Sequence, residues 1–106
     1  MTFEQKAFIQ LCKDSGCPSP DYEFRFNKIR RWRVDYYFEN GRRRLALEVE
    51  GGAWSNGRHV RGTGFIGDIE KYNALTLEGI WLLRVVPKDL LTVKTVEMVK
   101  KFLFGK

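Results

Sequence analysis

The feature that most constrains the fold of this chain is a predicted β-hairpin over residues 31–52. Two runs of alternating apolar and polar residues flank Asn40-Gly41, the residue pair that most favours a two-residue type I′ turn. With Asn40 and Gly41 at the centre of the turn, the apolar faces of the two strands coincide, and a slip by one residue would break this agreement. The sequence therefore predicts strands at about 32–38 and 44–50 in a fixed register.

The polar face of the predicted hairpin carries carboxylates. Asp35 lies on its first strand and Glu48 and Glu50 on its second, and the register places Asp35 diagonal to Glu48. The second strand is apolar enough to be buried, and buried carboxylates are paired, protonated or metal-bound. We therefore expect these acids to share a divalent ion, which prefers oxygen ligands. The alternative is a polar face in contact with water.

Helical and strand periodicities place the rest of the chain. A capping box at Thr2 begins a helix, Gly79 is placed to end another, and Pro87 ends a strand. The predicted elements are helix, strand, hairpin, helix, strand and helix, at residues 2–14, 22–26, 32–50, 63–78, 80–86 and 92–104. A helix between the last two strands implies a right-handed crossover and parallel pairing. The sequence thus predicts one α/β domain over residues 1–106, with a central mixed four-stranded sheet flanked by helices.

Apolar residues also predict which faces of these elements are buried. The stripe of the helix at 63–78 comprises Phe65, Ile69, Tyr72 and Thr76, and that of the last helix comprises Val93, Val96, Val99 and Leu103. Both helices are expected to pack these stripes on the sheet. The strand at 80–86 is a nearly continuous apolar run, which predicts a buried strand.

Basic residues surround the acidic hairpin, and the chain has a formal net charge of +6. Seven cations cluster before the hairpin and at its tip, namely Lys28, Arg30, Arg31, Arg33, Arg42, Arg43 and Arg44. A positive net charge favours a polyanionic partner, most often nucleic acid. Contact with phosphates is therefore the expected role of these residues, and solubilisation of a strand edge is the alternative.

Residues 51–67 contain six glycines together with Arg58, His59 and Arg61. The segment follows the acidic strand at its carboxyl end, where ligands bind in sheets with crossover helices. Its glycines and cations suit a loop that closes over a phosphodiester. His59 is the only histidine of the chain and is a candidate phosphate contact or proton-transfer group. An exposed loop histidine without a role is the alternative.

Composition excludes several other classes of protein. Hydrophobic residues make up 43% of the chain and aromatic residues 14%, so the chain is expected to be globular rather than disordered. Cys12 and Cys17 do not have the spacing of a zinc site, and no apolar run is long enough to cross a bilayer. Since no signal peptide is recognisable, the expected location is cytoplasmic, without a membrane partner.

The order of these motifs resembles the PD-(D/E)XK nuclease superfamily, in particular small phage-borne forms and proteins related to very-short-patch repair endonucleases. The residues that carry the resemblance lie at 32–35, 47–51 and 68–73, with the sequences WRVD, LEVEG and DIEKYN. The resemblance covers almost the whole chain, and it implies a restriction-endonuclease-like αβββαβ core.

The resemblance also implies site residues. Asp35 matches the motif aspartate and Glu48 the acid of the next strand, which in the family hold Mg²⁺ or Mn²⁺. Glu50, itself a candidate ligand, stands where the family has its lysine, so the identity of the general base is open. Lys71 on the following helix is the best replacement, and relatives with an acid at this place use a loop histidine, here His59.

By this resemblance the chain is an Mg²⁺-dependent endodeoxyribonuclease that hydrolyses DNA phosphodiester bonds in a bacterial or phage-infected cell. Its small size favours nicking that is directed by DNA structure, as in branched repair or recombination intermediates, or that is weakly specific for sequence. A homodimer would supply two sites for two strands. Contacts to the DNA backbone are expected from Arg30, Arg31, Arg33, Arg58 and Arg61, and Glu4 and Glu23 are secondary candidates for the acidic site.

Two other functions are compatible with the same residues. A non-catalytic nucleic-acid-binding module on the same fold would bind DNA in a salt-dependent way without needing magnesium. An interaction subunit would use its basic surface to contact an acidic protein and would bind no DNA. Cleavage of DNA that requires Mg²⁺, Asp35 and Glu48 would separate the nuclease from both alternatives.

Overall fold

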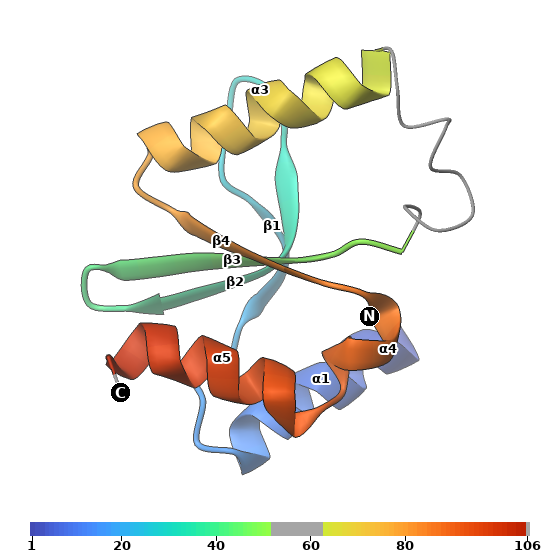
Figure 1. Ribbon diagram of the computed structural model, residues 1–106, viewed down its shortest axis with the longest axis vertical. Helices are drawn as coiled ribbons and strands as arrows, with labels where there is room; N and C mark the ends of the chain where they lie inside the picture. Colours follow the sequence, from blue (N-terminus) through green and yellow to red (C-terminus); the bar gives the residue numbers. More distant parts are fainter. Residues whose placement is uncertain (52–62, 106) are drawn as a thin grey trace.

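A four-stranded mixed sheet forms the centre of the computed structural model, which describes residues 1–51 and 63–105 (Figure 1). Its strands, in spatial order, are β1 (Asp21–Arg25), β2 (Arg33–Asn40), β3 (Arg43–Val49) and β4 (Trp81–Val85). β1 and β2 pair antiparallel, as do β2 and β3, whereas β3 and β4 pair parallel. The predicted α/β class, the mixed four-stranded sheet and the parallel pairing of its last two strands are therefore confirmed.

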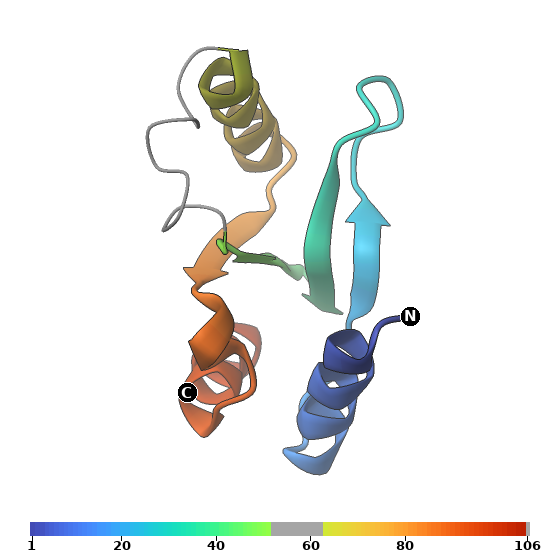
Figure 2. The same ribbon diagram turned by 90° about the vertical axis from the view of Figure 1, so that its right-hand side faces the viewer.

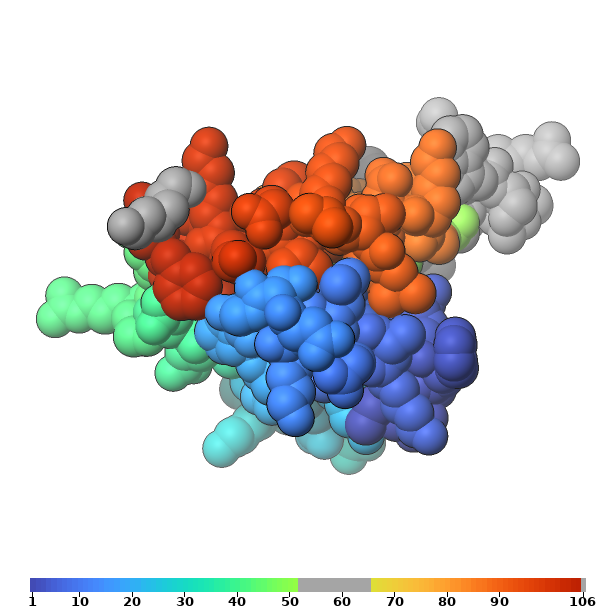
Figure 3. Space-filling model, turned by 90° about the horizontal axis from the view of Figure 1, so that it is seen from below, coloured from blue at the N-terminus to red at the C-terminus, as the bar shows by residue number. Residues whose placement is uncertain are grey.

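Helices cover both faces of the sheet. They are α1 (Phe3–Asp14), α3 (Thr63–Leu77), α4 (Pro87–Leu90) and α5 (Val93–Phe104). Among these described helices, α3 lies on one face, and α1, α4 and α5 lie on the other (Figure 1, Figure 2). Seen from the second face, α1 lies beside α4 and α5, so that the three helices form one layer (Figure 3). None of the described helices is long and apolar enough to span a membrane.

Local signals in the sequence set the ends of two helices. Thr2 and Gln5 form the predicted capping box at the start of α1, where the Gln5 N–H donates to Thr2 Oγ1 at 3.1 Å. α3 ends in a Schellman motif at Gly79, whose φ of +78° is left-handed, and the Ile80 N–H donates to the carbonyl of Leu75 at 2.9 Å. Both ends agree with the sequence-based prediction.

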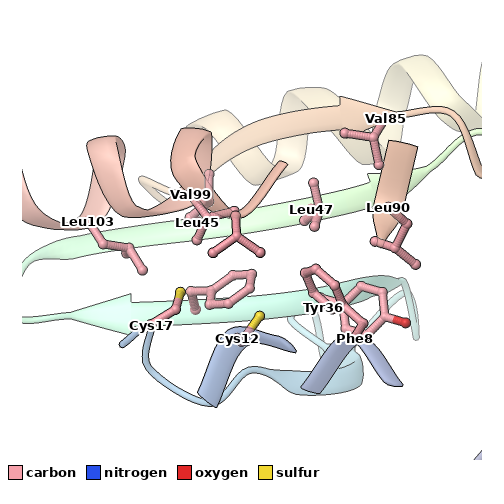
Figure 4. Close-up of a cluster of buried hydrophobic side chains, with 12 residues drawn as sticks. Phe8, Cys12, Cys17, Tyr36, Leu45, Leu47, Val85, Leu90, Val99 and Leu103 are labelled. Carbon is pink, nitrogen blue, oxygen red and sulfur yellow. The ribbon is translucent and has the colours of Figure 1, made fainter. Parts of the chain in front are cut away.

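The larger hydrophobic core lies between the sheet and the layer of α1, α4 and α5 (Figure 4). Its fully buried side chains include Phe8 of α1, Leu45 and Leu47 of β3, and Leu90 of α4. Each fully buried side chain of this size contributes roughly 1.5–3 kcal/mol. The sequence pattern does not predict α4. This short helix begins at Pro87 and places Leu90 in the core, so burial of this leucine accounts for the helix.

α5 packs on the sheet with a stripe that differs slightly from the predicted one. Val96, Val99 and Leu103 are buried as predicted, but Val93 is 69% exposed, so its predicted burial is wrong. At about 100° per residue, Val93 lies roughly 100° from the centre of the buried stripe, which also includes Thr95. The contact of α5 with the sheet therefore begins one turn after the start of the helix.

α3 is rotated about its axis by roughly a quarter of a turn from the predicted orientation. Ile69 and Thr76, which were expected to face the sheet, are exposed, whereas Leu75 is buried and Lys71 and Tyr72 are half-buried. Burying Leu75 rather than Thr76 removes more apolar surface from water, which accounts for the rotation. The consequence for the site is that Lys71 faces the sheet.

The hairpin between β2 and β3 turns one residue later than predicted. Asn40 pairs with Arg43, so Gly41 and Arg42 are the central turn residues, and the φ of Gly41 is +62°. A glycine of positive φ in the first central position is the pattern of a type II′ turn. The predicted register is therefore wrong by two residues, a shift that keeps the same faces together. The amide of Asn40 has another role, because its Nδ2 donates to the carbonyl of Leu103 at 2.7 Å.

β4 is an edge strand of the described sheet and is less buried than predicted. It pairs with β3 on one side, and its side chains range from Trp81, which is 67% exposed, to Val85, which is buried. The Trp81 ring lies 5.7 Å from that of Phe102 on α5, which covers one of its faces. The apolar run thus predicts the strand correctly but not its place at the edge.

Candidate functional site

Asp35 and Glu48 lie opposite each other where β2 and β3 separate. Backbone pairing of the two strands ends at Tyr36 and Leu47, and Asp35 and Glu48 are the next positions along this register. Their carboxylates accept hydrogen bonds from the backbone of the facing strand. Glu48 Oε2 accepts from the Asp35 N–H at 3.0 Å, and Asp35 Oδ2 accepts from the Val49 N–H at 2.7 Å. The two acids are therefore directly opposed, not diagonal as predicted, and one oxygen of each is fixed.

Lys71 of α3 is the cation that compensates the charge of Glu48. Its Nζ lies 2.6 Å from Glu48 Oε1, and both side chains are largely buried, with exposed fractions of 17% and 8%. Burial raises the pKa of the Glu48 carboxyl, the ammonium of Lys71 lowers it, and the charge of Asp35 raises it again. The fold therefore brings Lys71, which the family resemblance proposed, to Glu48.

The two opposed carboxylates suit a small, hard cation. Each has one oxygen bound to a backbone N–H, which leaves Asp35 Oδ1 and, once Lys71 moves away, Glu48 Oε1 as donors. The described residues contain no group of three histidine, cysteine or acidic side chains that could hold a metal ion. Magnesium sites commonly use only one or two carboxylates, with water and substrate oxygens completing the shell. Asp35 and Glu48 therefore fit a magnesium ion.

Glu50 lies in a separate cluster, beside Arg84 of β4 and Tyr72 of α3. Its Oε1 accepts from Arg84 Nη2 at 2.5 Å and Nε at 3.0 Å, and from the Tyr72 hydroxyl at 3.4 Å. Burial raises the pKa of Tyr72, and the charges of Glu50 and Glu48 raise it further. Tyr72 therefore keeps its proton and acts as a donor. The structure does not bring Glu50 into one group with Asp35 and Glu48.

Arg84 is a residue of this region that sequence reasoning missed. It is paired in register with Glu48 on the neighbouring strand, and its side chain is 55% exposed. The row Asp35, Glu48, Arg84 therefore crosses three strands. The available signal was its position as the one charged residue in the apolar run of residues 80–86. The row places Arg84 next to Glu48 along the sheet, while its guanidinium is bound to Glu50.

Two of the basic residues expected to contact DNA have acidic partners. Arg30 Nη2 lies 2.9 Å from Glu70 of α3, and its guanidinium lies 4.8 Å from the centre of the Trp32 ring. Arg33 Nη1 lies 3.6 Å from Glu23. All of these charged side chains remain about half exposed, so each arginine still reaches solvent beyond its partner.

The arginines at the hairpin tip have structural contacts. Arg43 Nη1 donates to the carbonyl of Phe102 at 2.7 Å, and Arg44 Nη1 donates to that of Glu78 at 2.7 Å. Both carbonyls belong to the last residues of a helix or directly follow it, where the helix dipole favours a positive charge. These two arginines thus attach the hairpin to the ends of α5 and α3.

The secondary acidic candidates lie on or next to α1. Glu4 is exposed in the first turn of this helix, and Glu23 Oε2 accepts from Gln5 Nε2 at 3.0 Å. Glu23 has a φ of +48°, which is uncommon for a residue with a side chain, and lies one strand away from Asp35. Within the described part of the chain, neither acid completes a three-ligand group with the opposed pair.

Three predicted site residues, Arg58, His59 and Arg61, lie outside the residues that the structure describes, as does the side chain of Phe65. Their predicted roles stay predictions. In comparisons with protein-family models, curated proteins and solved structures, none matched this chain.

Proposed function

We propose that this protein is a metal-dependent endonuclease that hydrolyses DNA phosphodiester bonds. The observation that carries the proposal is the opposition of Asp35 and Glu48 at the point where β2 and β3 separate. Each carboxylate is oriented by a backbone N–H of the facing strand, and Lys71 lies 2.6 Å from one of them. Two oriented carboxylates and a lysine from three different elements thus form one polar site.

Asp35 and Glu48 would hold Mg²⁺, or Mn²⁺ in its place, through the oxygen that is not fixed by the neighbouring strand. When bound, such an ion supplies a polarised phosphate and a coordinated water of lowered pKa. The hydrogen bonds from the Asp35 and Val49 N–H groups keep the two carboxylates in place without any ion. The site is therefore preorganised for a cation, which lowers the cost of binding one.

Lys71 has two states in this proposal. Without a cation, its ammonium neutralises Glu48. When a cation takes that role, the ammonium is free to donate to a phosphodiester oxygen and to offset the charge that develops there. Arg84, in the same row and 55% exposed, could contact the same phosphate once it leaves Glu50. His59 remains the alternative for proton transfer.

The net charge of +6 and the exposed cations near β2 support DNA as the substrate. Lys28 and Arg31 are exposed, and Arg30 and Arg33 are about half exposed. These residues precede Asp35 by two to seven positions, so a backbone bound by them passes close to the acid pair. A single acid pair cuts one strand at a time, and the expected first product is nicked DNA.

A second candidate is a DNA-binding module that does not cut. The observation that favours it is that Asp35 and Glu48 already have structural partners in the ion-free protein, namely two backbone N–H groups and Lys71. In such a module, Asp35 and Glu48 would only stabilise the fold where β2 and β3 separate. Such a module would bind DNA equally well with and without magnesium.

Plasmid nicking separates the two candidates. We expect the wild-type protein to nick supercoiled DNA with Mg²⁺ or Mn²⁺ and not with EDTA, and we expect Asp35→Asn and Glu48→Gln to reduce the rate at least about 100-fold. Both substitutions keep the size and an oxygen acceptor of the side chain. Glu97→Gln, at an exposed acid of α5 on the opposite face, is the matched control and is expected to keep full activity.

Two results would contradict the nuclease proposal. The first is a wild-type protein that leaves supercoiled, branched and single-stranded DNA intact with both metals. The second is nicking that persists unchanged in Asp35→Asn, because it would come from a contaminant or another site. Calorimetry with Mn²⁺ measures binding of the cation independently of cleavage.

A further inference from the structure

The turn between β1 and β2 is organised by one asparagine. Asn27 Oδ1 accepts from the backbone N–H groups of Ile29 at 3.1 Å and Arg30 at 2.9 Å, and the Asn27 carbonyl accepts from the Arg31 N–H at 3.1 Å. Side-chain bonds of this kind fix a tight turn without help from a strand. Arg31 completes the turn with a left-handed φ of +60°. As a result, Ile29 lies at the tip and is 91% exposed.

The base of this turn is attached to the rest of the protein. Phe26 is buried and stacks with Trp32 at 6.2 Å between ring centres, so that an aromatic pair closes the turn. Asn27 Nδ2 lies 3.3 Å from a carboxylate oxygen of Glu78, and Arg30 pairs with Glu70, so both contacts tie the turn to α3. Figure 2 shows the turn projecting from the sheet beside α3. Ile29 is therefore presented outward by an anchored turn.

The surroundings of Ile29 distinguish it from the other exposed apolar side chains. Single exposed apolar residues are common on protein surfaces. Leu77 is 86% exposed, nearly as much as Ile29, but its neighbour in sequence is the acidic Glu78. Ile29 is instead flanked by Lys28, Arg30 and Arg31, which are all exposed. In a DNA duplex, negatively charged phosphates surround stacked apolar bases. An apolar tip between three cations is complementary to this arrangement, because the cations can contact phosphates while the tip contacts bases.

We propose that Ile29 is a wedge that inserts between the bases of DNA at a step whose stacking is already interrupted, as at a bulge. Proteins that kink DNA insert such apolar side chains and hold the flanking phosphates with cations. Insertion has a free-energy cost that is smallest where a base is unpaired or unstacked. Lys28, Arg30 and Arg31 hold the phosphates on either side. The wedge therefore gives the protein a preference for interrupted duplexes over perfect ones.

The position of the turn relates the wedge to the acid pair. Ile29 precedes Asp35 by six residues, so the two are at most roughly 20 Å apart along the chain. This length corresponds to about six base pairs of a duplex. Cleavage is therefore expected within about six base pairs of the interruption. The inference uses the DNA-binding part of the proposed function and does not require that the protein cut.

Binding in EDTA tests the wedge apart from cleavage. Affinities are measured for a perfect duplex and for the same duplex with one bulged nucleotide, and 2-aminopurine beside the bulge reports unstacking by its fluorescence. We expect the wild-type protein to prefer the bulged duplex by about tenfold and to raise the fluorescence. Ile29→Ser is expected to lower this preference at least about fivefold while keeping its affinity for the perfect duplex, since its cations are intact.

Two further variants make the test specific. Ile29→Leu keeps an apolar wedge and is expected to retain the preference and the fluorescence change. Leu77→Ser removes an apolar side chain that is nearly as exposed as Ile29 and is followed by the acidic Glu78. This variant is expected to keep the wild-type preference for the bulged duplex. Because all these positions are exposed, the variants should unfold at the same temperature as the wild-type protein, which circular dichroism checks.

Four outcomes would contradict the wedge proposal. Two concern the variants: Ile29→Ser keeps the full preference for the bulged duplex, or Leu77→Ser loses this preference to the same extent. Two concern the wild-type protein: it binds both duplexes equally well, or it binds no DNA at low salt. A protein that prefers the bulged duplex through Ile29 but does not nick plasmid DNA with Mg²⁺ would support the wedge proposal and contradict only the nuclease proposal. The two proposals therefore fail in distinguishable ways.

Discussion

The two faces of the sheet are held to their helices in different ways. Among the residues whose side chains the structure describes, the face covered by α1, α4 and α5 has a cluster of 12 buried residues, and the face covered by α3 has a cluster of six. α3 is also attached by ionic contacts, among them Lys71 with Glu48 and Arg30 with Glu70. The difference teaches that the described apolar side chains pack mainly on one face. The other face is left for ionisable groups, and the candidate site lies there.

The largest effect is expected from a cavity on the apolar face. Phe8 is fully buried and its ring lies 4.6 Å from that of Tyr36, so Phe8→Ala should destabilise the protein by about 3–5 kcal/mol. Leu75→Ala, the corresponding change under α3, should cost less, about 2 kcal/mol, because it removes a smaller side chain from the smaller of the two described clusters. Urea unfolding measures both values. Equal losses at the two positions would remove the distinction between the faces.

An intermediate effect is expected from Lys71. In Lys71→Met the buried carboxylate of Glu48 loses its cation, and we expect a loss of about 1–3 kcal/mol in EDTA. The same variant frees Glu48 Oε1, so it should bind Mn²⁺ about tenfold more tightly than wild type in calorimetry. Lys94→Met, at an exposed lysine of α5, is the matched control and should change neither quantity. Weaker Mn²⁺ binding in Lys71→Met would contradict competition between lysine and metal.

The smallest effect is a dependence of stability on pH. The folded state raises the pKa of Glu48 above its ordinary value of 4.5, chiefly by burial, so the folded state binds this proton more tightly than the unfolded state. The stability of the ion-free protein should therefore fall as the pH rises above about 4.5, by no more than about 1.4 kcal/mol per pH unit. Unfolding curves of wild type and Glu48→Gln between pH 4 and 7 isolate this contribution. Parallel pH profiles would show that the carboxyl is not perturbed.

Most of the elements follow from local signals in the sequence. The capping box at Thr2, the glycine at the end of α3 and the proline after β4 act within a few residues, and each is found where predicted. Alternation also predicts that Asp35 and Glu48 share one face, but the predicted register placed them diagonal rather than directly opposed. Lys71, which the family resemblance proposed, lies beside Glu48 in the structure.

The sequence-based predictions are wrong where contacts between residues distant in sequence determine the structure. The turn at Gly41 depends on Asn40, whose amide is taken by a carbonyl 63 residues away at the end of α5. The orientation of α3 depends on which of two neighbouring side chains, Leu75 or Thr76, fits under the helix. Arg84 and Glu50 pair across strands that a periodicity does not order in space. Tertiary contacts determine these features, and a periodic pattern along the sequence carries no information about such contacts.

The long crossover that carries α3 has a consequence for the order of assembly. The β2–β3 hairpin closes over a two-residue turn, a step of about 1–10 μs, whereas β4 must return to β3 after residues 50–80 have been arranged. We therefore expect Asp35 and Glu48 to meet before Lys71 is in place. During that interval the hairpin would hold the two carboxylates without their lysine, and under the proposed function dissolved Mg²⁺ would compete with Lys71 for them.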